Sequence, residues 1–550
     1  MQEQDYILIG VFTLIVLSAG LAFARTGRSM ANFFAGGGNV PWWISGLSLF
    51  MSFFSAGTFV VWGSIAYDQG MVAVTIQSMM AIAGLIIYFT VARKWKEANV
   101  LTAAEYVTHR FGVKTQKIYS YLFIAVSFFT AGSFLYPVAK IVSVSAQVPI
   151  TLIILILGIT IVLYTAVGGF WAVLATDVLQ FVVLTAAVFI VIPLALDEVG
   201  GMDGFIAQSP EGFFGLINSE FSPMFLVAFM LYNFVFIGGN WAYVQRYTSV
   251  KSPKEAKKVA LLFAGFYLVF PLIWMLPPMI YKVYDPGLVT TQQMEGAYLM
   301  MCAKALPIGM LGLMIAAMVF ATASSVNTTL NMMAAVTTND LYKSIHPQAS
   351  EKQLIKVARW VTVVFGLGVM GVAMLVPYLG GIVNVVLKVA AVTGAPLFAP
   401  ILWSLYSRRQ DSRSVIITSI LSIVGLALII LILPSVLDYE VSRSMEMTLG
   451  VAVPVCMLIL FEIKNRPVLS GEKAPVTIGS DQEVEEVERS GDDTAFGIKV
   501  ISIATGMIGL IMTGLGIIAS KGNEMLVAAG IIMVLMASAG LYFGKKKSKN

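Results

Sequence analysis

Residues 41–67 read PWWISGLSLFMSFFSAGTFVVWGSIAY, an apolar run with small and polar residues at its centre. About 20 predominantly apolar residues cross the hydrocarbon core of a bilayer as a helix. Inside that core, irregular backbone persists only where protein or water satisfies its hydrogen bonds. The cluster Ser55-Ala56-Gly57-Thr58 therefore predicts a helix break that frees backbone carbonyls to bind a cation. Close helix packing through small residues explains the same cluster, so both interpretations stay open.

Similar apolar runs recur along the whole chain. Its 550 residues are 58% hydrophobic and 12% charged, whereas soluble globular chains carry about 25% charged residues. The composition predicts an all-α polytopic membrane protein and argues against an ordinary soluble enzyme. The fifteen expected spans cover residues 6–24, 41–66, 71–91, 118–146, 149–166, 171–195, 223–247, 258–283, 308–340, 356–379, 382–405, 413–434, 442–463, 497–519 and 524–543.

The positions of Lys and Arg predict the orientation of these spans. With the N-terminus outside and the C-terminus cytoplasmic, most of the 35 basic residues lie in cytoplasmic segments. Arg246, Lys352, Lys356 and Arg359 are among these cytoplasmic residues. The net charge of +5 thus reflects topology in a cell membrane rather than nucleic-acid binding. The acidic stretch 464–496 is expected to be a flexible cytoplasmic linker.

Other residue counts exclude further classes of protein. Cys302 and Cys456 cannot form a disulfide framework, and His109 and His346 fall in polar connections, which argues against a metal centre. The start lacks the basic region of a secretory signal peptide, so the first span is expected to be retained. No soluble domain of useful size is apparent, so any transport is driven by an ion gradient or is passive.

Polar side chains within the expected spans mark candidate sites. In the span 308–340, Ala321, Ser324 and Ser325 present a carbonyl and two hydroxyls within about one turn. Hard cations bind such oxygen ligands, although hydroxyls that bond back to their own helix are an alternative. Asp177 lies inside the sixth span, where an unpaired carboxylate is costly. We therefore expect Asp177 to have a cationic partner or a functional role. The alternative is that Asp177 lies close enough to the membrane interface to stay hydrated.

Two lysines also lie within spans. Lys140 and Lys388 are each near an external helix end, where their side chains can reach the headgroups.

Four segments carry a resemblance to a known family. They are FFAGGGNVPWWISGLSLFMSFFSAGTF (33–59), YTAVGGFWAVLATDVLQ (164–180), QRYTSVKSPKEAKK (245–258) and ATASSVNTTLNMMAAVTTNDLYK (321–343). In this order they resemble the sodium:solute symporter family, as in its sodium/galactose, sialic acid and proline transporters. The similarity runs from about residue 6 to about residue 463.

The resemblance implies a leucine-transporter-like fold with an inverted five-helix repeat and additional flanking helices. An extra span and a cytoplasmic loop occupy residues 1–40, and two additional spans occupy 406–463. The implied repeats are 41–195 and 223–405, joined by an external loop at 196–222. Two C-terminal spans and a basic tail occupy 497–550.

The resemblance also places a sodium site. Carried over by position, its ligands are the carbonyls of Met51, Phe54 and Ala321 and the hydroxyls of Ser324 and Ser325. Asp177 matches an acidic residue near the cytoplasmic exit of the ion, which helps to bind a second sodium in some members. Ala321 replaces the serine that those members offer, so one sodium per cycle is expected.

The substrate pocket of the sugar transporters is only partly matched. Asn233 stands at a sugar-contacting asparagine, and Phe236 stands at the inner-gate tyrosine. Tyr267, Gln77 and Ala390 replace a lysine, a glutamate and a glutamine, so galactose itself is doubtful. The candidate contacts are Thr58, Gln77, Asn233 and Tyr267, with Lys388 available for an anionic solute. Ordinary hydrogen bonding between helices is the alternative for each of them.

Together these features predict a sodium-coupled symporter that takes up a small polar organic solute by alternating access. It is expected to work as a monomer in the bilayer, without catalysis and without a cofactor other than the coupling ion. A proton-coupled symporter with Asp177 as the titrating group, and a solute sensor, are the alternatives.

Overall fold

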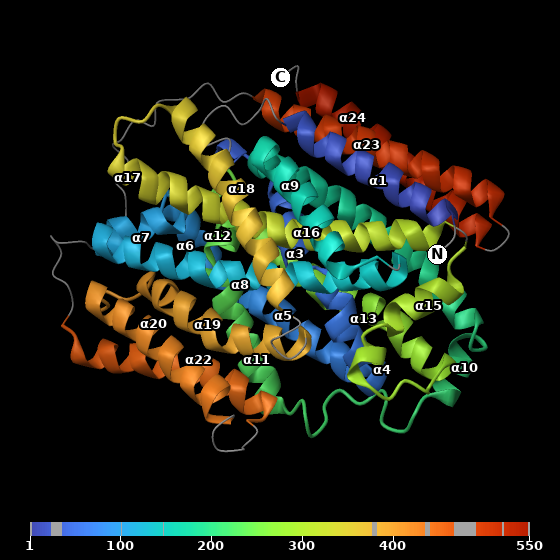
Figure 1. Ribbon diagram of the computed structural model, residues 1–550, viewed down its shortest axis with the longest axis horizontal. Helices are drawn as coiled ribbons and strands as arrows, with labels where there is room; N and C mark the ends of the chain where they lie inside the picture. Colours follow the sequence, from blue (N-terminus) through green and yellow to red (C-terminus); the bar gives the residue numbers. More distant parts are fainter. Residues whose placement is uncertain are drawn as a thin grey trace.

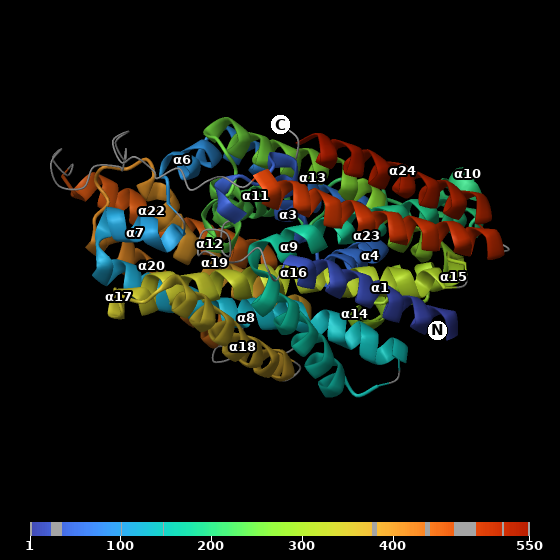
Figure 2. The ribbon, with the colours of Figure 1, turned by 90° about the horizontal axis from the view of Figure 1, so that it is seen from above.

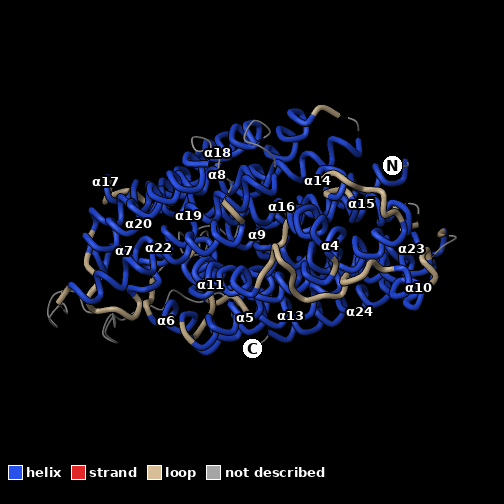
Figure 3. The backbone as a smooth tube through the Cα atoms, turned by 90° about the horizontal axis from the view of Figure 1, so that it is seen from below, coloured by secondary structure: helices blue, strands red, loops and turns tan. Residues whose placement is uncertain are grey.

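The computed structural model of the chain describes residues 3–23, 36–100, 102–146, 148–307, 309–376, 382–434, 441–466, 491–519 and 522–547. In these ranges the chain is helical, and only a single bridge between Val40 and Val250 has strand geometry. Figure 3 shows helices joined by loops. Most of the expected acidic linker, residues 467–490, lies outside the described residues.

The first half of the chain forms elements that follow the expected spans. They are α1 (Glu3–Ala22), η2 (Gly36–Gly38), α3 (Trp42–Phe53), the π-helical η3 (Thr58–Trp62), α4 (Gly63–Gln69), α5 (Met71–Phe89), α6 (Val91–Glu97), α7 (Ala103–Phe111), α8 (Val113–Ala146), α9 (Ile150–Asp197), α10 (Gly201–Gln208), α11 (Pro223–Gly239), α12 (Trp241–Thr248) and α13 (Pro253–Tyr284).

The second half continues the same pattern. Its elements are α14 (Thr291–Met294), α15 (Ala297–Ala305), α16 (Met310–Ala335), the π-helical η4 (Val336–Tyr342), α17 (Lys343–Ile345), α18 (Glu351–Leu375), α19 (Ile382–Ser404), α20 (Ser412–Ala427), the π-helical η6 (Leu428–Ile432), α22 (Arg443–Lys464), α23 (Gly491–Ile518) and α24 (Asn523–Lys547).

The number of spans agrees with the expectation when bent and short helices are included. Among the described residues, 11 helices are long and apolar enough to cross a membrane, or 13 if each of two bent pairs counts as one span. Two shorter apolar helices, Ile150–Leu163 and Lys388–Ser404, correspond to the remaining expected spans. Hydropathy counts segments well because every helix in lipid must be apolar over the same thickness.

The first bend is the one that the sequence predicts. α3 and the segment formed by η3 and α4 meet at 60°, across a break after Phe53. Phe54 is extended, with φ −92° and ψ 118°, so the helical hydrogen bonds stop there. The second bend, 61° between α11 and α12, was not expected, because 223–247 was read as one continuous span. Asn240 is extended there and caps α12 by accepting a hydrogen bond from the Ala242 N–H.

Two expected spans, the fifth and the sixth, are joined without a break in the helix. The sequence predicts separate spans at 149–166 and 171–195, but the residues between them are helical and α9 runs for 48 residues. At 1.5 Å per residue its path measures about 72 Å, more than twice the roughly 30 Å of the hydrocarbon core. One helix therefore supplies the residues of both expected spans.

The helices lie side by side and run roughly along one direction (Figures 1 and 2). In Figure 1, α10, α15 and the N-terminus lie toward one end of the bundle, and α7 and α17 lie at the opposite end. This separation matches the assignment of their loops to opposite sides of the membrane. α16 is the most enclosed of the candidate spans, with 89% of its apolar window buried.

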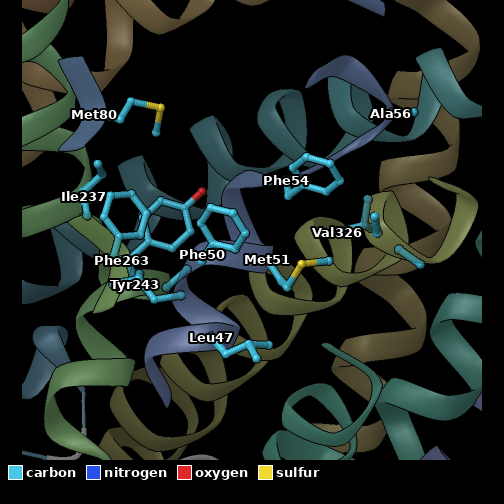
Figure 4. Packing of buried hydrophobic residues seen from close by; sticks show 14 of the residues in the cluster. Leu47, Phe50, Met51, Phe54, Ala56, Met80, Ile237, Tyr243, Phe263 and Val326 are labelled. Carbon is cyan, nitrogen blue, oxygen red and sulfur yellow. The ribbon is translucent and has the colours of Figure 1, made fainter. Parts of the chain in front are cut away.

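Buried aromatic residues hold the broken span in place. The ring of Phe54 packs 3.8 Å from that of Trp274, and Phe50 packs 4.9 Å from Phe266, both partners lying on α13. Figure 4 shows Phe50, Met51 and Phe54 among side chains from other helices, including Met80, Ile237, Tyr243, Phe263 and Val326. Burial on all sides is what lets an interrupted helix persist in the membrane.

The N-terminal helix and the two C-terminal helices pack together on one flank of the molecule, whereas α20 packs against α19, and α22 packs against α19 and α11. α1 lies against α9 and α16, and α23 lies against α9 and α1, with α24 packed along α23. Asp5 of α1 accepts a hydrogen bond of 2.9 Å from the Gly312 N–H in the first turn of α16. A Cβ at Gly312 would lie only 2.2 Å from the Asp5 carbonyl oxygen, so the close approach of α1 requires glycine there.

Candidate functional site

The break in α3 brings backbone oxygens to the face of α16. The Ser325 hydroxyl donates a hydrogen bond of 3.0 Å to the carbonyl of Ser52, and it lies 3.4 Å from the carbonyl oxygen of Phe54. Two of the residues expected to bind sodium, Phe54 and Ser325, are thus brought together by elements distant in the sequence. Ser52 is a neighbour that the expected ligand set did not include.

The other expected sodium ligands lie nearby in different roles. The Met51 carbonyl accepts a hydrogen bond of 3.1 Å from the Phe54 N–H, which closes the last turn of α3. Ala321 is fully buried one turn before Ser325 on α16. Thr322, which sequence reasoning missed, accepts a 2.7 Å hydrogen bond from the Ala56 N–H and so ties the far side of the break to α16.

Ser324 faces a different partner from Ser325. Its hydroxyl donates to Oδ1 of Asp177, while the Ser48 hydroxyl donates to Oδ2 of the same carboxylate. Successive residues on a helix are about 100° apart, and here the two adjacent serines bond to different partners. Ser325 therefore bonds to a carbonyl at the break in α3, and Ser324 bonds to the Asp177 carboxylate on α9.

Asp177 has the cationic partner that its position predicts. Nη2 of Arg246, on α12, lies 4.0 Å from Oδ2 of Asp177, and both side chains are fully buried. Complete burial contradicts the alternative of a hydrated aspartate. Arg246, which the sequence places at the cytoplasmic end of the span 223–247, has its side chain inside the protein. α12 turns inward after the unexpected bend at Asn240, and this turn carries the guanidinium into the protein.

The guanidinium of Arg246 is also held by neutral groups. It donates 2.8 Å to the Thr328 hydroxyl, 3.1 Å to the Ser48 hydroxyl and 2.9 Å to the Ala242 carbonyl. These hydrogen bonds join α12 to α3 and α16. We call Ser48, Asp177, Arg246, Ser324 and Thr328 the buried charge network. A buried ion pair is tolerated only when such hydrogen bonds satisfy its remaining donors and acceptors.

Gln180 is a further residue that sequence reasoning missed. It lies one turn after Asp177 on α9 and is fully buried. Neither atom of its amide has a hydrogen-bond partner in the part of the chain that the structure describes. Buried polar groups normally have partners, so this amide is available to a water molecule or an ion. In the sequence, Gln180 is marked only by its position at the end of 164–180, one of the four segments that resemble the known family.

A second site is a cavity of about 150 Å³ beside the break. Four of the five expected substrate residues, Thr58, Gln77, Asn233 and Tyr267, line it, as do Ala390 and the expected gate residue Phe236. Sequence reasoning missed other polar residues of its wall, namely Thr130, Ser133, Tyr232, Tyr243 and Thr393. Every residue that lines this cavity is uncharged.

Some polar side chains of the cavity already have a hydrogen-bond partner among the described residues, and others do not. The Asn233 amide donates 2.8 Å to the Phe229 carbonyl, and the Thr393 hydroxyl donates 2.7 Å to the Val389 carbonyl. The Gln77 amide, although almost completely buried, has no hydrogen bond to any described residue. The same is true of the Tyr267 hydroxyl. Gln77 and Tyr267 are therefore free to bind a solute, and so are the hydroxyls of Ser133, Tyr232 and Tyr243, which have no hydrogen bond to a described residue either.

The fifth expected substrate residue, Lys388, is not among the cavity residues. Its Nζ lies 4.0 Å from Oε1 of Glu446 on α22. Lys140 is similarly placed, 3.8 Å from Oε2 of Glu295 in the connection between α14 and α15. Burial raises the pKa of the Glu295 carboxyl, and Lys140 opposes this rise. Both lysines keep just over a third of their side chains exposed, and each is near a carboxylate rather than only near the headgroups.

Aromatic residues connect the cavity to the break. The Phe53 ring lines the cavity and packs 4.3 Å from Tyr243 and 6.0 Å from Phe236. The next residue, Phe54, supplies the carbonyl beside Ser325. Thr58 lines the cavity and accepts a 3.2 Å hydrogen bond from the Ser55 N–H. A change at either site therefore reaches the other through the same few residues of the broken span.

Comparison with known proteins identifies what these features are similar to. The model of the sodium:solute symporter family matches residues 33–422. A sodium/glucose cotransporter of Vibrio parahaemolyticus is 26% identical over 90% of this chain and 96% of its own. A sodium/sialic acid symporter of Aliivibrio fischeri is 25% identical over 76% of this chain and 86% of its own.

A solved structure shares the fold. It is the substrate-bound, outward-open state of a sodium-coupled sialic acid symporter, with a TM-score of 0.71 at 20% identity. The match covers 85% of this chain and 99% of the solved chain. At this identity the likeness concerns the arrangement of the helices.

Proposed function

The chain belongs to the sodium:solute symporter family, and we propose that the break in α3 couples sodium binding to the uptake of a small neutral solute. Sodium-coupled solute uptake across a membrane is the function of the family, and its relatives are transporters. The alternatives of proton coupling and solute sensing are not favoured. We propose which residues bind the sodium ion, which residues bind the transported solute and what kind of solute it is.

The sodium site is proposed at the break in α3. The observation that carries it is the Ser325 hydroxyl, which lies at the carbonyls of Ser52 and Phe54. Together with the carbonyls of Met51 and Ala321, these groups offer the neutral oxygen ligands that a hard cation binds. A sodium ion there links α3 to α16. About 2.3 kcal/mol per charge is available from each 100 mV of membrane potential, before the sodium gradient is added.

Asp177 and Ser324 are proposed as the groups that sodium passes on the way to the cytoplasm. They are next to the sodium site because Ser324 and Ser325 are adjacent on α16. The Asp177 carboxylate is already paired with Arg246 and accepts hydrogen bonds from two hydroxyls. It therefore has no free negative charge for a second sodium ion. This supports one sodium ion per cycle.

Two five-helix repeats are proposed to move against each other. The first, 41–195, begins with the bent pair at 60°, and the second, 223–405, begins with the bent pair at 61°. Their contacts correspond as well, since α3 packs on α13 and α11 packs on α5. Corresponding interrupted helices in two halves are typical of inverted-repeat transporters, with the sites between them. Residues 1–40, 406–463 and 497–550 flank these repeats.

The orientation in the membrane and the number of chains in the functional unit are also part of the proposal. We propose that the N-terminus is outside and the C-terminus is cytoplasmic in the cell membrane, as the Lys and Arg positions predict. We also propose that one chain is the functional unit.

A neutral solute is favoured by the cavity wall. Every residue that lines it is uncharged, and Lys388 is next to Glu446 instead. A charged solute would lose its hydration without gaining an opposite charge, which costs several kcal/mol. Amide and hydroxyl groups beside aromatic rings suit a solute with several hydroxyl or amide groups of its own.

The solute class is tested by a thermal-unfolding screen of the purified protein with and without sodium. A ligand that binds the native state at 100 times its Kd adds about 2.7 kcal/mol of stability. We expect neutral polyhydroxylated or amide compounds to raise the unfolding temperature in sodium but not in potassium. Stabilisation by carboxylates or amines alone would show that the neutral assignment is wrong, while sodium coupling would be judged separately from gradient-driven uptake in proteoliposomes.

Gln77→Leu is expected to raise the KM for the solute by about 10- to 100-fold, because a hydrogen bond to a buried polar group is lost. The apparent affinity for sodium in the absence of solute should stay within about twofold of the wild type, since Gln77 does not touch the break. Ser78→Ala is the matched control, because Ser78 follows Gln77 on α5 and its hydroxyl bonds to the Val74 carbonyl of its own helix. Equal KM values for the two variants would contradict a role for Gln77.

A further inference from the structure

A basic face lies at the polar end of α18. Lys352, Lys356 and Arg359 are spaced four and three residues apart, which places them on one side of the helix. They line a surface hollow of about 600 Å³ together with Ile355 and Trp360. We call the three cations the basic face.

Within the ranges that the structure describes, these cations have no anionic partner. No ion pair or hydrogen bond joins any of their side chains to another described residue, and Nε of Arg359 is buried without a partner. Basic residues at the start of α13 differ, because Lys257 lies over the ring of Tyr88 and Lys258 lies over Trp42. Among the described residues nothing neutralises the basic face, which lies beside a hollow.

The depth of the basic face in the bilayer follows from the length of the helix. α18 has 25 residues and measures about 38 Å, so roughly 8 Å of it extends beyond a hydrocarbon core of about 30 Å. The first turns hold the cations, and the rest of the helix is apolar. Arg359 and Trp360 lie about 12–14 Å from the start of the helix, just inside the edge of the hydrocarbon core. The long Arg359 side chain reaches back to the headgroups, and Trp360 is 64% exposed beside it.

An apolar stripe continues from the basic face toward the membrane centre. Trp360, Val364 and Leu367 are 64%, 58% and 60% exposed, and their spacing of four and three residues keeps them on one side of α18. Lys356 precedes Trp360 by four residues, so the stripe lies below the basic face. A single phospholipid contacts both parts, with its phosphate on the basic face and its acyl chains on the stripe, whereas a soluble anion contacts only the basic face.

We propose that the basic face binds the phosphate of an anionic phospholipid whose acyl chains lie along the apolar stripe. In the proposed orientation this is a lipid of the cytoplasmic leaflet, whose surface is negatively charged. α18 packs against α8, α9 and α16, so the lipid braces a helix that contacts the one carrying Ser324 and Ser325. The interaction is independent of the transported solute.

Native mass spectrometry of the full chain tests this site, with phosphatidylglycerol and phosphatidylcholine added in equal amounts to the detergent-solubilised protein. The wild type is expected to retain phosphatidylglycerol in preference to phosphatidylcholine. The variant Lys352→Gln/Lys356→Gln/Arg359→Gln should retain at least about tenfold less phosphatidylglycerol. The control Lys251→Gln/Lys254→Gln/Lys258→Gln removes the same charge from the start of α13 and should behave like the wild type.

Three outcomes would overturn the proposal. They are equal retention of the two lipids by the wild type, an equal loss in both triple variants, and displacement of phosphatidylglycerol by inorganic phosphate at millimolar concentration. The last would show that a soluble anion is bound rather than a lipid. Lys356→Gln alone, with two cations left, should show a smaller loss, and it keeps the test valid if the triple variant does not fold.

Discussion

Ser325→Ala is expected to abolish sodium-stimulated uptake while the protein stays folded. The hydroxyl of Ser325 is the side-chain group that reaches from α16 to the carbonyls freed by the break in α3. Removal of even an outer-sphere partner costs about 10- to 100-fold in metal affinity, so loss of a direct oxygen ligand should cost at least as much. The measurement is the sodium concentration dependence of uptake in proteoliposomes, together with the sodium-dependent shift in unfolding temperature.

Thr329→Val is the matched control for this change. Thr329 lies one turn further along α16, and its hydroxyl bonds to the Ser325 carbonyl of its own helix rather than to α3. Its sodium dependence should resemble that of the wild type. If Ser325→Ala keeps the wild-type sodium dependence, sodium does not bind at the break.

Arg246→Met is expected to destabilise the protein by about 3–5 kcal/mol, because it leaves the carboxylate of Asp177 buried without its cation. Asp177→Asn should be destabilising in the same way, since the guanidinium of Arg246 then loses its anion. In the double variant Asp177→Asn/Arg246→Met neither charge remains, so part of the loss should be recovered. A double-mutant cycle from unfolding of the detergent-solubilised protein measures this coupling.

An exposed ion pair in the same molecule provides the comparison. Arg93 and Glu97 lie 2.6 Å apart on α6, and both side chains are largely exposed. Arg93→Gln should cost about 0.5 kcal/mol or less, because water screens such a pair. If Arg246→Met costs no more than Arg93→Gln, or if the double variant is as unstable as the sum of the single ones, the buried charge network does not stabilise the native state as described.

The helices were predictable from the sequence because the bilayer imposes one simple requirement on every span. The break after Phe53 was one of two interpretations of the small and polar residues at the centre of the second span, and close helix packing was the other. The bend at Asn240 was not recognised, although Gly238, Gly239 and Asn240 form a helix-ending and helix-starting pattern. The continuous course of α9 through residues 167–170 was missed as well.

The candidate residues were found more reliably than their partners. Thr58, Gln77, Asn233 and Tyr267 line one cavity, as the resemblance implied, but Lys388 is beside Glu446 instead. Asp177 was expected to need a cation, and only the inward turn of α12 identifies it as Arg246. Whether these groups bind sodium and solute stays a prediction for the experiments above.

The sequence by itself determined that this is a helical membrane protein, where its second span can break and which family it resembles. These properties depend on composition, local pattern and motif order along one stretch of chain. Only the tertiary structure decided that Ser325 faces the break while Ser324 faces Asp177, and that Arg246 is buried beside that carboxylate. Such pairings depend on how helices far apart in the sequence rotate and bend against each other, and no local pattern records that geometry.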